Sequence, residues 1–96
     1  MRNRFIITYD ISDDERRSKV FTALRGFGDH IQYSVFRCDL SDRERVSLNA
    51  TLHVLIDHQY DQILLFDLGP VDGRAGGCVD AIGRRYISPE RTVVVI

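Results

Sequence analysis

An aspartate closes the first apolar segment of this chain and stands just before a cluster of basic residues. The segment FIITYD ends at Asp10, and Arg16, Arg17 and Lys19 follow within the next ten positions. A carboxylate supplies the hard oxygen ligands that a divalent cation prefers, and the planar fork of arginine suits bidentate contacts to phosphate. These residue types therefore fit a site that handles phosphate groups with the help of a metal ion.

Plain structural interpretations account for the same residues. An aspartate at the end of a strand often forms an Asx turn, here before Ser12. The three basic residues can form a solvated helix face that balances the acidic residues 13–15. Tyr9 and Phe36 fit core packing as well as base stacking. Spacing alone leaves both interpretations open.

Composition restricts the class of protein. The chain has 96 residues, 44% of them apolar and 28% charged, with a formal net charge of -1, which is typical of a soluble globular domain. It contains no run of apolar residues long enough to cross a membrane and begins without a secretory segment, so we expect a cytoplasmic protein without membrane contact. The charge balance argues weakly against nucleic-acid binding. Arginine, however, supplies all the basic residues except Lys19.

The first half of the chain predicts a strand followed by a helix. Residues 4–10 alternate in a strand pattern that places Phe5, Ile7 and Tyr9 on one face. Ser12 and Glu15 have the spacing of a capping box, so a helix is expected to begin at Ser12. Glycines 26 and 28 are expected to end it. At 100° per residue, Arg17 lies in line with the apolar stripe of this helix, so its guanidinium is expected near the strand end and Asp10.

The second half predicts further strands and a second helix. Residues 31–38 are expected to form one strand, and a second capping box, Ser41 to Glu44, begins the next helix. Residues 62–68 are apolar on both faces, as in a strand without a solvated side. Two short strands are expected at 79–82 and at the closing TVVVI, residues 92–96.

From these elements we predict an α+β fold, a ferredoxin-like βαββαβ sandwich with an extra C-terminal strand, in a single domain over residues 1–96. Two helices cover only one face of the sheet, whereas strands 4–10 and 62–68 are apolar on both. We therefore expect a homodimer that packs sheet to sheet, with residues 91–96 donated to the partner as a terminal strand.

Two motifs carry a resemblance to a known family. YDISDDERRSKV at residues 9–20 and IQYSVF at residues 31–36, with a closing short apolar strand, resemble CRISPR-associated protein 2. This is the family of small dimeric subunits with a nuclease fold in the spacer-acquisition machinery of CRISPR adaptive immunity. The resemblance extends in length and element order over nearly the whole chain.

The resemblance implies roles for particular residues. Asp10 matches the family aspartate at the end of the first strand, where the two copies of the dimer share one divalent metal, usually Mg²⁺. Tyr9, Arg17 and Phe36 match further positions linked to activity, and Lys19 replaces a frequent arginine. We accordingly predict three groups of site residues. They are catalytic Asp10, Tyr9 and Arg17; nucleic-acid-binding Arg16, Arg17, Lys19 and Phe36; and the metal ligand Asp10.

The chain departs from the family pattern at two positions. His30 stands where some members carry arginine, and Arg37 stands where an acid is frequent. Neither change touches Asp10.

Three functional classes fit these observations. The first is a metal-dependent endonuclease that cleaves single-stranded RNA or double-stranded DNA, with paired Asp10 side chains holding Mg²⁺. The second is a non-catalytic dimeric scaffold that bridges CRISPR integrase subunits and holds protospacer DNA through arginine contacts. The third is a ligand-binding regulatory dimer, which the fold alone allows. The run YDISDDERR favours the first two, because a small-molecule sensor does not need a carboxylate flanked by arginines on a dimer axis.

Overall fold

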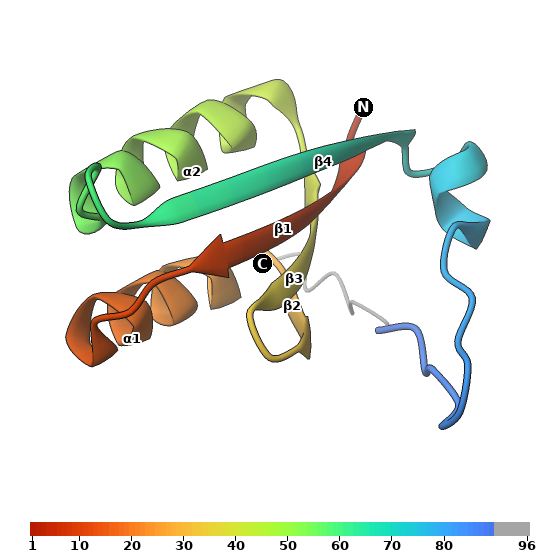
Figure 1. The fold of residues 1–96 in the computed structure, drawn as a ribbon. Helices are drawn as coiled ribbons and strands as arrows, with labels where there is room; N and C mark the ends of the chain where they lie inside the picture. The colour runs from red at the N-terminus through yellow and green to blue at the C-terminus, as the bar shows by residue number, and fades with distance from the viewer. Residues whose placement is uncertain (90–96) are drawn as a thin grey trace.

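The protein folds as two helices and a four-stranded sheet in a computed structural model that describes residues 1–89 (Figure 1). The elements, in chain order, are β1 (Asn3–Asp10), α1 (Asp14–Arg25), β2 (Asp29–Gln32), β3 (Val35–Leu40), α2 (Asp42–Leu55), β4 (Gln62–Pro70) and the short 3₁₀ helix η1 (Arg74–Gly77). The predicted α+β class is therefore confirmed. The predicted terminal strand at 91–96 lies outside the described residues.

The sheet has the strand order β2-β3-β1-β4, and every neighbouring pair is antiparallel. β1 lies in the centre, where Ile7 is opposite Phe36 of β3 on one side and Leu65 of β4 on the other. This order and the succession βαββαβ are those of the ferredoxin-like arrangement. The last residue of β1, Asp10, thus lies at one end of the central strand.

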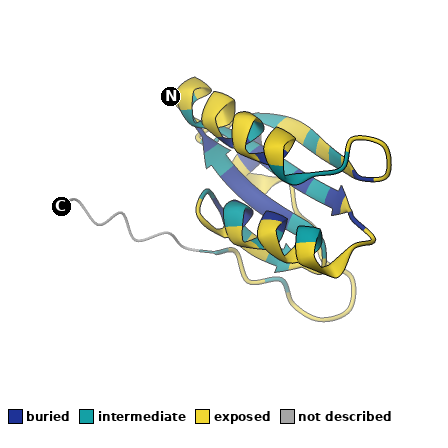
Figure 2. Ribbon diagram, turned by 90° about the vertical axis from the view of Figure 1, so that its left-hand side faces the viewer, coloured by how far each residue is buried: buried dark blue, intermediate teal, exposed yellow. Residues whose placement is uncertain are grey.

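The core fills the space between the sheet and the two helices, which cover the same face of the sheet (Figure 2). Phe5, Ile7 and Tyr9 are buried on that face, as the alternation in residues 4–10 predicts. Ile6 and Thr8 point to the opposite face, which carries no helix of the described chain. We call this opposite face the open face.

Apolar side chains occupy part of the open face. Phe66 and Leu64 of β4 are opposite Ile6 and Thr8 of β1, so the four side chains share this face. Phe66 is 48% exposed and Leu64 is 44% exposed, although both belong to a sheet strand. The prediction that β1 and β4 are apolar on both faces is confirmed.

The expected single strand at residues 31–38 was wrong. The chain instead forms a hairpin, in which β2 and β3 are joined by a tight turn at Tyr33 and Ser34. Tyr33 has a φ of 36°, a left-handed conformation that no strand residue adopts. The continuous β-forming sequence IQYSVF hid this turn, because no glycine or asparagine marks it.

The expected strand at residues 79–82 was also wrong. This segment has no regular structure in the described chain, and Ile82 is fully exposed. A strand needs a partner edge, and within residues 1–89 this segment pairs with no strand.

The helix boundaries follow the predicted signals with one shift. The N-cap of α1 is Asp13 rather than Ser12, because the Asp13 carboxylate accepts a hydrogen bond from the backbone N–H of Arg16 at 2.9 Å. Aspartate caps a helix as well as serine does, and its charge also complements the helix dipole. The second capping box, formed by Ser41 and Glu44, is confirmed.

Glycine ends α1 as predicted, and Gly28 has a second reason for its small size. Its N–H donates to the carbonyl of Leu24 at 2.9 Å, which closes the end of the helix. A Cβ at this position would collide with the Arg37 carbonyl oxygen and with Sγ of Cys38. Gly28 therefore lets the chain pass directly against β3 before the hairpin begins.

Arg37 joins the segment after η1 to the sheet. It is opposite Ile6 in the sheet register and so belongs to the open face, yet it is buried. Its guanidinium donates to Oγ of Ser88 at 2.9 Å and to the carbonyl of Pro89 at 2.8 Å. These two hydrogen bonds bring the end of the described chain back to the open face beside β3.

Candidate nucleic-acid and metal site

Asp10 lies at the exposed end of the central strand, on the open face. Gln62 of β4 is its neighbour across the sheet. Within residues 1–89 the Asp10 carboxylate makes no hydrogen bond or ion pair, and the Asx turn considered from the sequence is not formed. The carboxylate is therefore available to a ligand.

The chemistry of Asp10 fits a hard divalent cation in part. A carboxylate oxygen is a preferred ligand of Mg²⁺, which keeps several waters and needs only one or two protein carboxylates. Among the described residues, no group of three or more His, Cys, Asp or Glu side chains is arranged to hold a metal ion. Among residues 1–89, Asp10 therefore belongs to no such group, and a second copy is the simplest source of another carboxylate.

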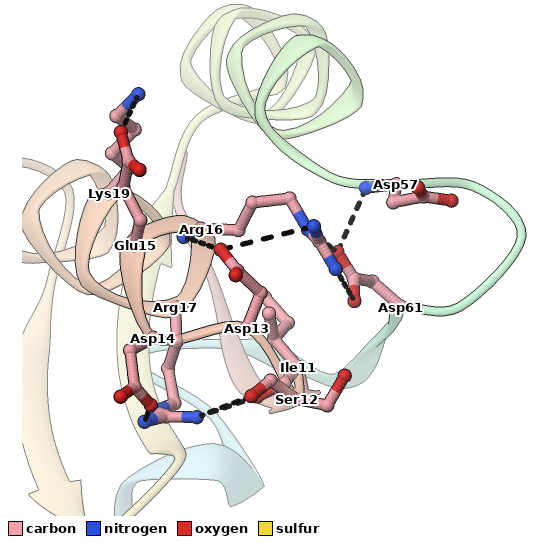
Figure 3. A network of polar contacts seen from close by, with 10 residues as sticks. All are labelled: Ile11, Ser12, Asp13, Asp14, Glu15, Arg16, Arg17, Lys19, Asp57 and Asp61. Carbon is pink, nitrogen blue, oxygen red and sulfur yellow. Dashed lines mark hydrogen bonds and ion pairs between the residues drawn. The ribbon is translucent and has the colours of Figure 1, made fainter.

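Arg16 is held in an ion pair with Asp61, which lies just before β4 (Figure 3). Its Nε donates to one carboxylate oxygen at 2.7 Å and its Nη2 to the other at 3.2 Å, so the pair is bidentate. The Asp61 side chain is completely buried and also accepts from the backbone N–H of Asp57 at 2.8 Å. Arg16 therefore joins α1 to the turn after α2.

This pairing changes the acid-base properties of both groups. The hydrogen bonds from Arg16 lower the pKa of Asp61, and the Asp57 N–H adds to the effect. In turn, the carboxylate of Asp61 raises the pKa of Arg16. Because the fork of Arg16 is occupied, we assign this residue to holding the fold together and leave it out of the proposed phosphate contacts.

The lowered pKa of Asp61 predicts a loss of stability in acid. A carboxylate with a lower pKa in the folded state adds stability above its unfolded pKa, which is near 3.8, and loses it as pH falls through the folded value. We expect Asp61→Asn to lower the urea midpoint of unfolding at neutral pH, and the gap to wild type to narrow below about pH 4.

A matched control for this experiment is Asp14→Asn, which changes an exposed carboxylate on α1 paired with Arg17. It should leave the urea midpoint nearly unchanged, because exposed ion pairs contribute little. A difference in urea midpoint between wild type and Asp61→Asn that stays constant from neutral to acid pH would contradict the link between the lowered pKa of Asp61 and stability.

Arg17 lies at the end of β1, as predicted from its place on the helix. Its Nη1 donates to the carbonyl of Ile11 at 2.9 Å, and its Nη2 pairs with Asp14 (Figure 3). The side chain remains 41% exposed. Arg17 is thus fixed beside the residue that follows Asp10, and its positive charge is partly offset by Asp14.

Lys19 points away into solvent on α1. Its Nζ lies 3.3 Å from a carboxylate oxygen of Glu15, and both side chains are mostly exposed. This is the solvated helix face that the sequence allowed, and it also leaves the ammonium group accessible to a phosphate.

Tyr9 and Phe36 belong to the core. Phe36 is fully buried, and its ring lies 5.3 Å from that of Phe21 and 5.1 Å from that of His30. Tyr9 is also buried, with its ring 6.3 Å from Phe36. Phe36 has no surface for direct contact with nucleic acid, so we leave it out of the proposed contacts.

A surface pocket of about 380 Å³ adjoins the end of β1, between α1 and the β2–β3 turn. It is lined by Tyr9, Asp14, Arg17, Ser18, Phe21, Tyr33 and Ser34. Sequence reasoning missed Tyr33, because the residue was placed inside a continuous strand. The pocket brings Tyr9 and Arg17 together, as predicted, but neither forms a hydrogen bond with Asp10 in the described chain.

Comparison with known proteins identifies the family. The family model described as CRISPR associated protein Cas2 matches residues 3–72, which include the whole sheet and both helices. The chain belongs to the Cas2 family. The resemblance seen in the two sequence motifs is therefore confirmed.

Individual Cas2 relatives extend this similarity over the whole chain. A protein of Rhodospirillum rubrum named CRISPR-associated endoribonuclease Cas2 1 is 34% identical over 92 residues, which cover 96% of this chain and 89% of the relative. A CRISPR-associated endoribonuclease Cas2 of Geobacter sulfurreducens is 30% identical over 96 residues and covers 100% of both chains.

Solved structures agree with the Cas2 assignment. A hypothetical protein of Thermus thermophilus superimposes with a TM-score of 0.79 at 29% identity, covering 94% of this chain and 100% of that chain. Cas2 of Streptococcus pyogenes superimposes with a TM-score of 0.73 at 26% identity, covering 83% and 99% respectively. In the part of this Cas2 chain that the structure describes, no helix is both long and apolar enough to span a membrane.

Proposed function

We propose that two copies of this chain form a metal-dependent endonuclease of CRISPR adaptive immunity that cleaves phosphodiester bonds of single-stranded RNA. The observation that carries the proposal is the Asp10 carboxylate, which stands exposed and without a partner within residues 1–89 at the end of the central strand. The endoribonuclease names of the relatives support this reaction class. Double-stranded DNA is a further substrate of the same phosphodiester chemistry.

The dimer follows from the open face of the sheet. Ile6, Leu64 and Phe66 form an apolar patch there that the described chain leaves partly exposed. Burial of such a patch against the same patch of a second copy is favourable, and a twofold axis is the commonest way to achieve it. Asp10 belongs to the same face, so a twofold axis near the end of β1 would bring two Asp10 carboxylates together.

Each group at the site has a separate task in this proposal. The two Asp10 carboxylates would hold Mg²⁺, which when bound would act as a Lewis acid on the phosphate and make a water more acidic. Arg17, fixed by the carbonyl of Ile11, adds positive charge beside the phosphate backbone. Tyr9 supports this end of β1 in two ways. Its side chain is buried in the core, and its backbone N–H donates to the backbone carbonyl of Ser34 at 3.1 Å.

The proposal is tested by incubating the purified protein with labelled single-stranded RNA, in Mg²⁺ and in EDTA, with duplex DNA in parallel. We expect cleavage of the RNA that requires the metal. Absence of cleavage under every condition, with dimers intact and duplex DNA still bound, would overturn the proposal that the protein is a nuclease. It would favour the scaffold that bridges CRISPR integrase subunits and holds protospacer DNA.

A further inference from the structure

We propose that Tyr33 is a stacking platform for an unpaired base of the nucleic-acid substrate, beside the pocket at the end of β1. This inference rests on the proposed function and adds a positioning residue to it. The Tyr33 side chain is 90% exposed, whereas the neighbouring aromatic residues Tyr9 and Phe36 are buried. An exposed aromatic ring offers a flat surface on which any unstacked base can lie.

The backbone at Tyr33 adopts an unfavourable conformation that directs the ring outward. Tyr33 has a φ of 36°, which is uncommon for a residue other than glycine. A strained conformation of this kind persists only where the surroundings hold it, and such positions gather at functional sites.

Contacts on both sides hold the turn. Nε2 of the His30 ring contacts the carbonyl oxygen of Tyr33, and the carbonyl of Ser34 accepts from the N–H of Tyr9 at 3.1 Å. The His30 ring is itself packed against Phe21, with the ring centres 5.1 Å apart. The Tyr33 ring thus projects from a turn whose backbone is already held, so little backbone freedom is lost when a base binds.

The pocket beside Tyr33 fits a nucleoside better than a phosphate. Tyr9 and Phe21 supply apolar surface, whereas Ser18, Asp14 and Arg17 supply hydrogen-bonding groups. Because the positive charge of Arg17 is partly offset by Asp14, the pocket favours a nucleotide, whose base and ribose add contacts, over a free phosphate. The carboxylate and hydroxyl groups can instead accept and donate hydrogen bonds to a base edge or to a ribose hydroxyl.

The position of the pocket connects it to Asp10. Tyr9 lines the pocket, and Asp10 is the next residue along β1. A nucleotide held by Tyr33 would therefore lie at the same end of β1 as the proposed metal ligand, although the Asp10 side chain points to the open face and Tyr9 to the core. Since a base inside a duplex is already stacked on its neighbours, this platform selects single-stranded substrates.

The test measures RNA binding rather than cleavage. Single-stranded RNA that contains 2-aminopurine is titrated with the Asp10→Asn protein, whose cleavage is expected to be lost, and fluorescence quenching reports stacking of the probe base. Adding Tyr33→Ala should remove most of the quenching and weaken the affinity about 5- to 100-fold. Tyr33→Phe should retain both. The control Tyr60→Ala, which removes a tyrosine that is 70% exposed after α2, should change neither.

Other outcomes overturn the inference. Unchanged quenching and affinity with Tyr33→Ala would exclude stacking on this ring, as would an equal dependence on Tyr33 for the same probe in a duplex. Loss of the dimer in Tyr33→Ala, seen by size-exclusion chromatography, would assign the ring to a contact between copies. If wild type binds RNA through Tyr33 but never cleaves it, the nuclease proposal fails and the stacking site stands.

Discussion

The substitution Asp10→Asn is expected to abolish Mg²⁺-dependent cleavage of single-stranded RNA, with a loss of about 10³-fold or more. Asparagine has nearly the same shape but lacks the negative charge that binds a hard cation. Because the Asp10 carboxylate is exposed and has no partner within residues 1–89, its replacement leaves the packing of the described chain unchanged. The rate of cleavage at saturating Mg²⁺ is the measurement.

The matched control is Asp72→Asn, which removes an exposed carboxylate from the loop after β4. It should cleave RNA at the wild-type rate. Circular dichroism and size-exclusion chromatography should show that Asp10→Asn keeps the fold and the dimer. Cleavage by Asp10→Asn at the wild-type rate would remove Asp10 from the metal site.

The substitution Phe36→Ala is expected to destabilise the domain by about 3–5 kcal/mol, the usual cost of truncating a buried phenylalanine. Phe36 is fully buried on the central part of the sheet, and its ring contacts those of Tyr9, Phe21 and His30. Because small domains have only about 5–15 kcal/mol of stability, this loss removes a large share of it. Unfolding in urea measures the effect.

Two further variants separate packing from contact with nucleic acid. Phe36→Leu should lose far less stability, because most of the buried volume is kept. The control Val54→Ala, at an exposed position of α2, should behave as wild type. A Phe36→Ala protein that is as stable as wild type but no longer binds RNA would contradict the core assignment and support a direct contact.

Most elements of the fold could be predicted from local signals. The alternation in residues 4–10 predicted which side chains face the core, since side chains of a strand point to alternate faces. The capping box at Ser41 and Glu44 formed as expected, because its hydrogen bonds lie within four residues. Where two caps of similar strength stand side by side, as at Ser12 and Asp13, the local pattern does not choose between them.

The errors arose where the chain depends on distant partners. The turn at Tyr33 is a left-handed conformation in a sequence of strand-forming residues, and contacts from His30 and β1 hold it. Residues 79–82 have the composition of a strand, but no sheet edge pairs with them in the described chain. Strand formation needs a pairing edge, which a short window of sequence does not contain.

The candidate site divides in the same way. The sequence by itself determined the Cas2 family, the α+β class and the place of Asp10 at the end of the first strand, because each is carried by contiguous residues. Only the tertiary structure decided which charged side chains and aromatic rings are free to contact nucleic acid. Arg16 is occupied by the distant Asp61, Phe36 is enclosed in the core, and Tyr33 is exposed at the pocket. Ion pairing and burial depend on residues far apart in the chain, so only the folded structure determines which side chains can contact a ligand.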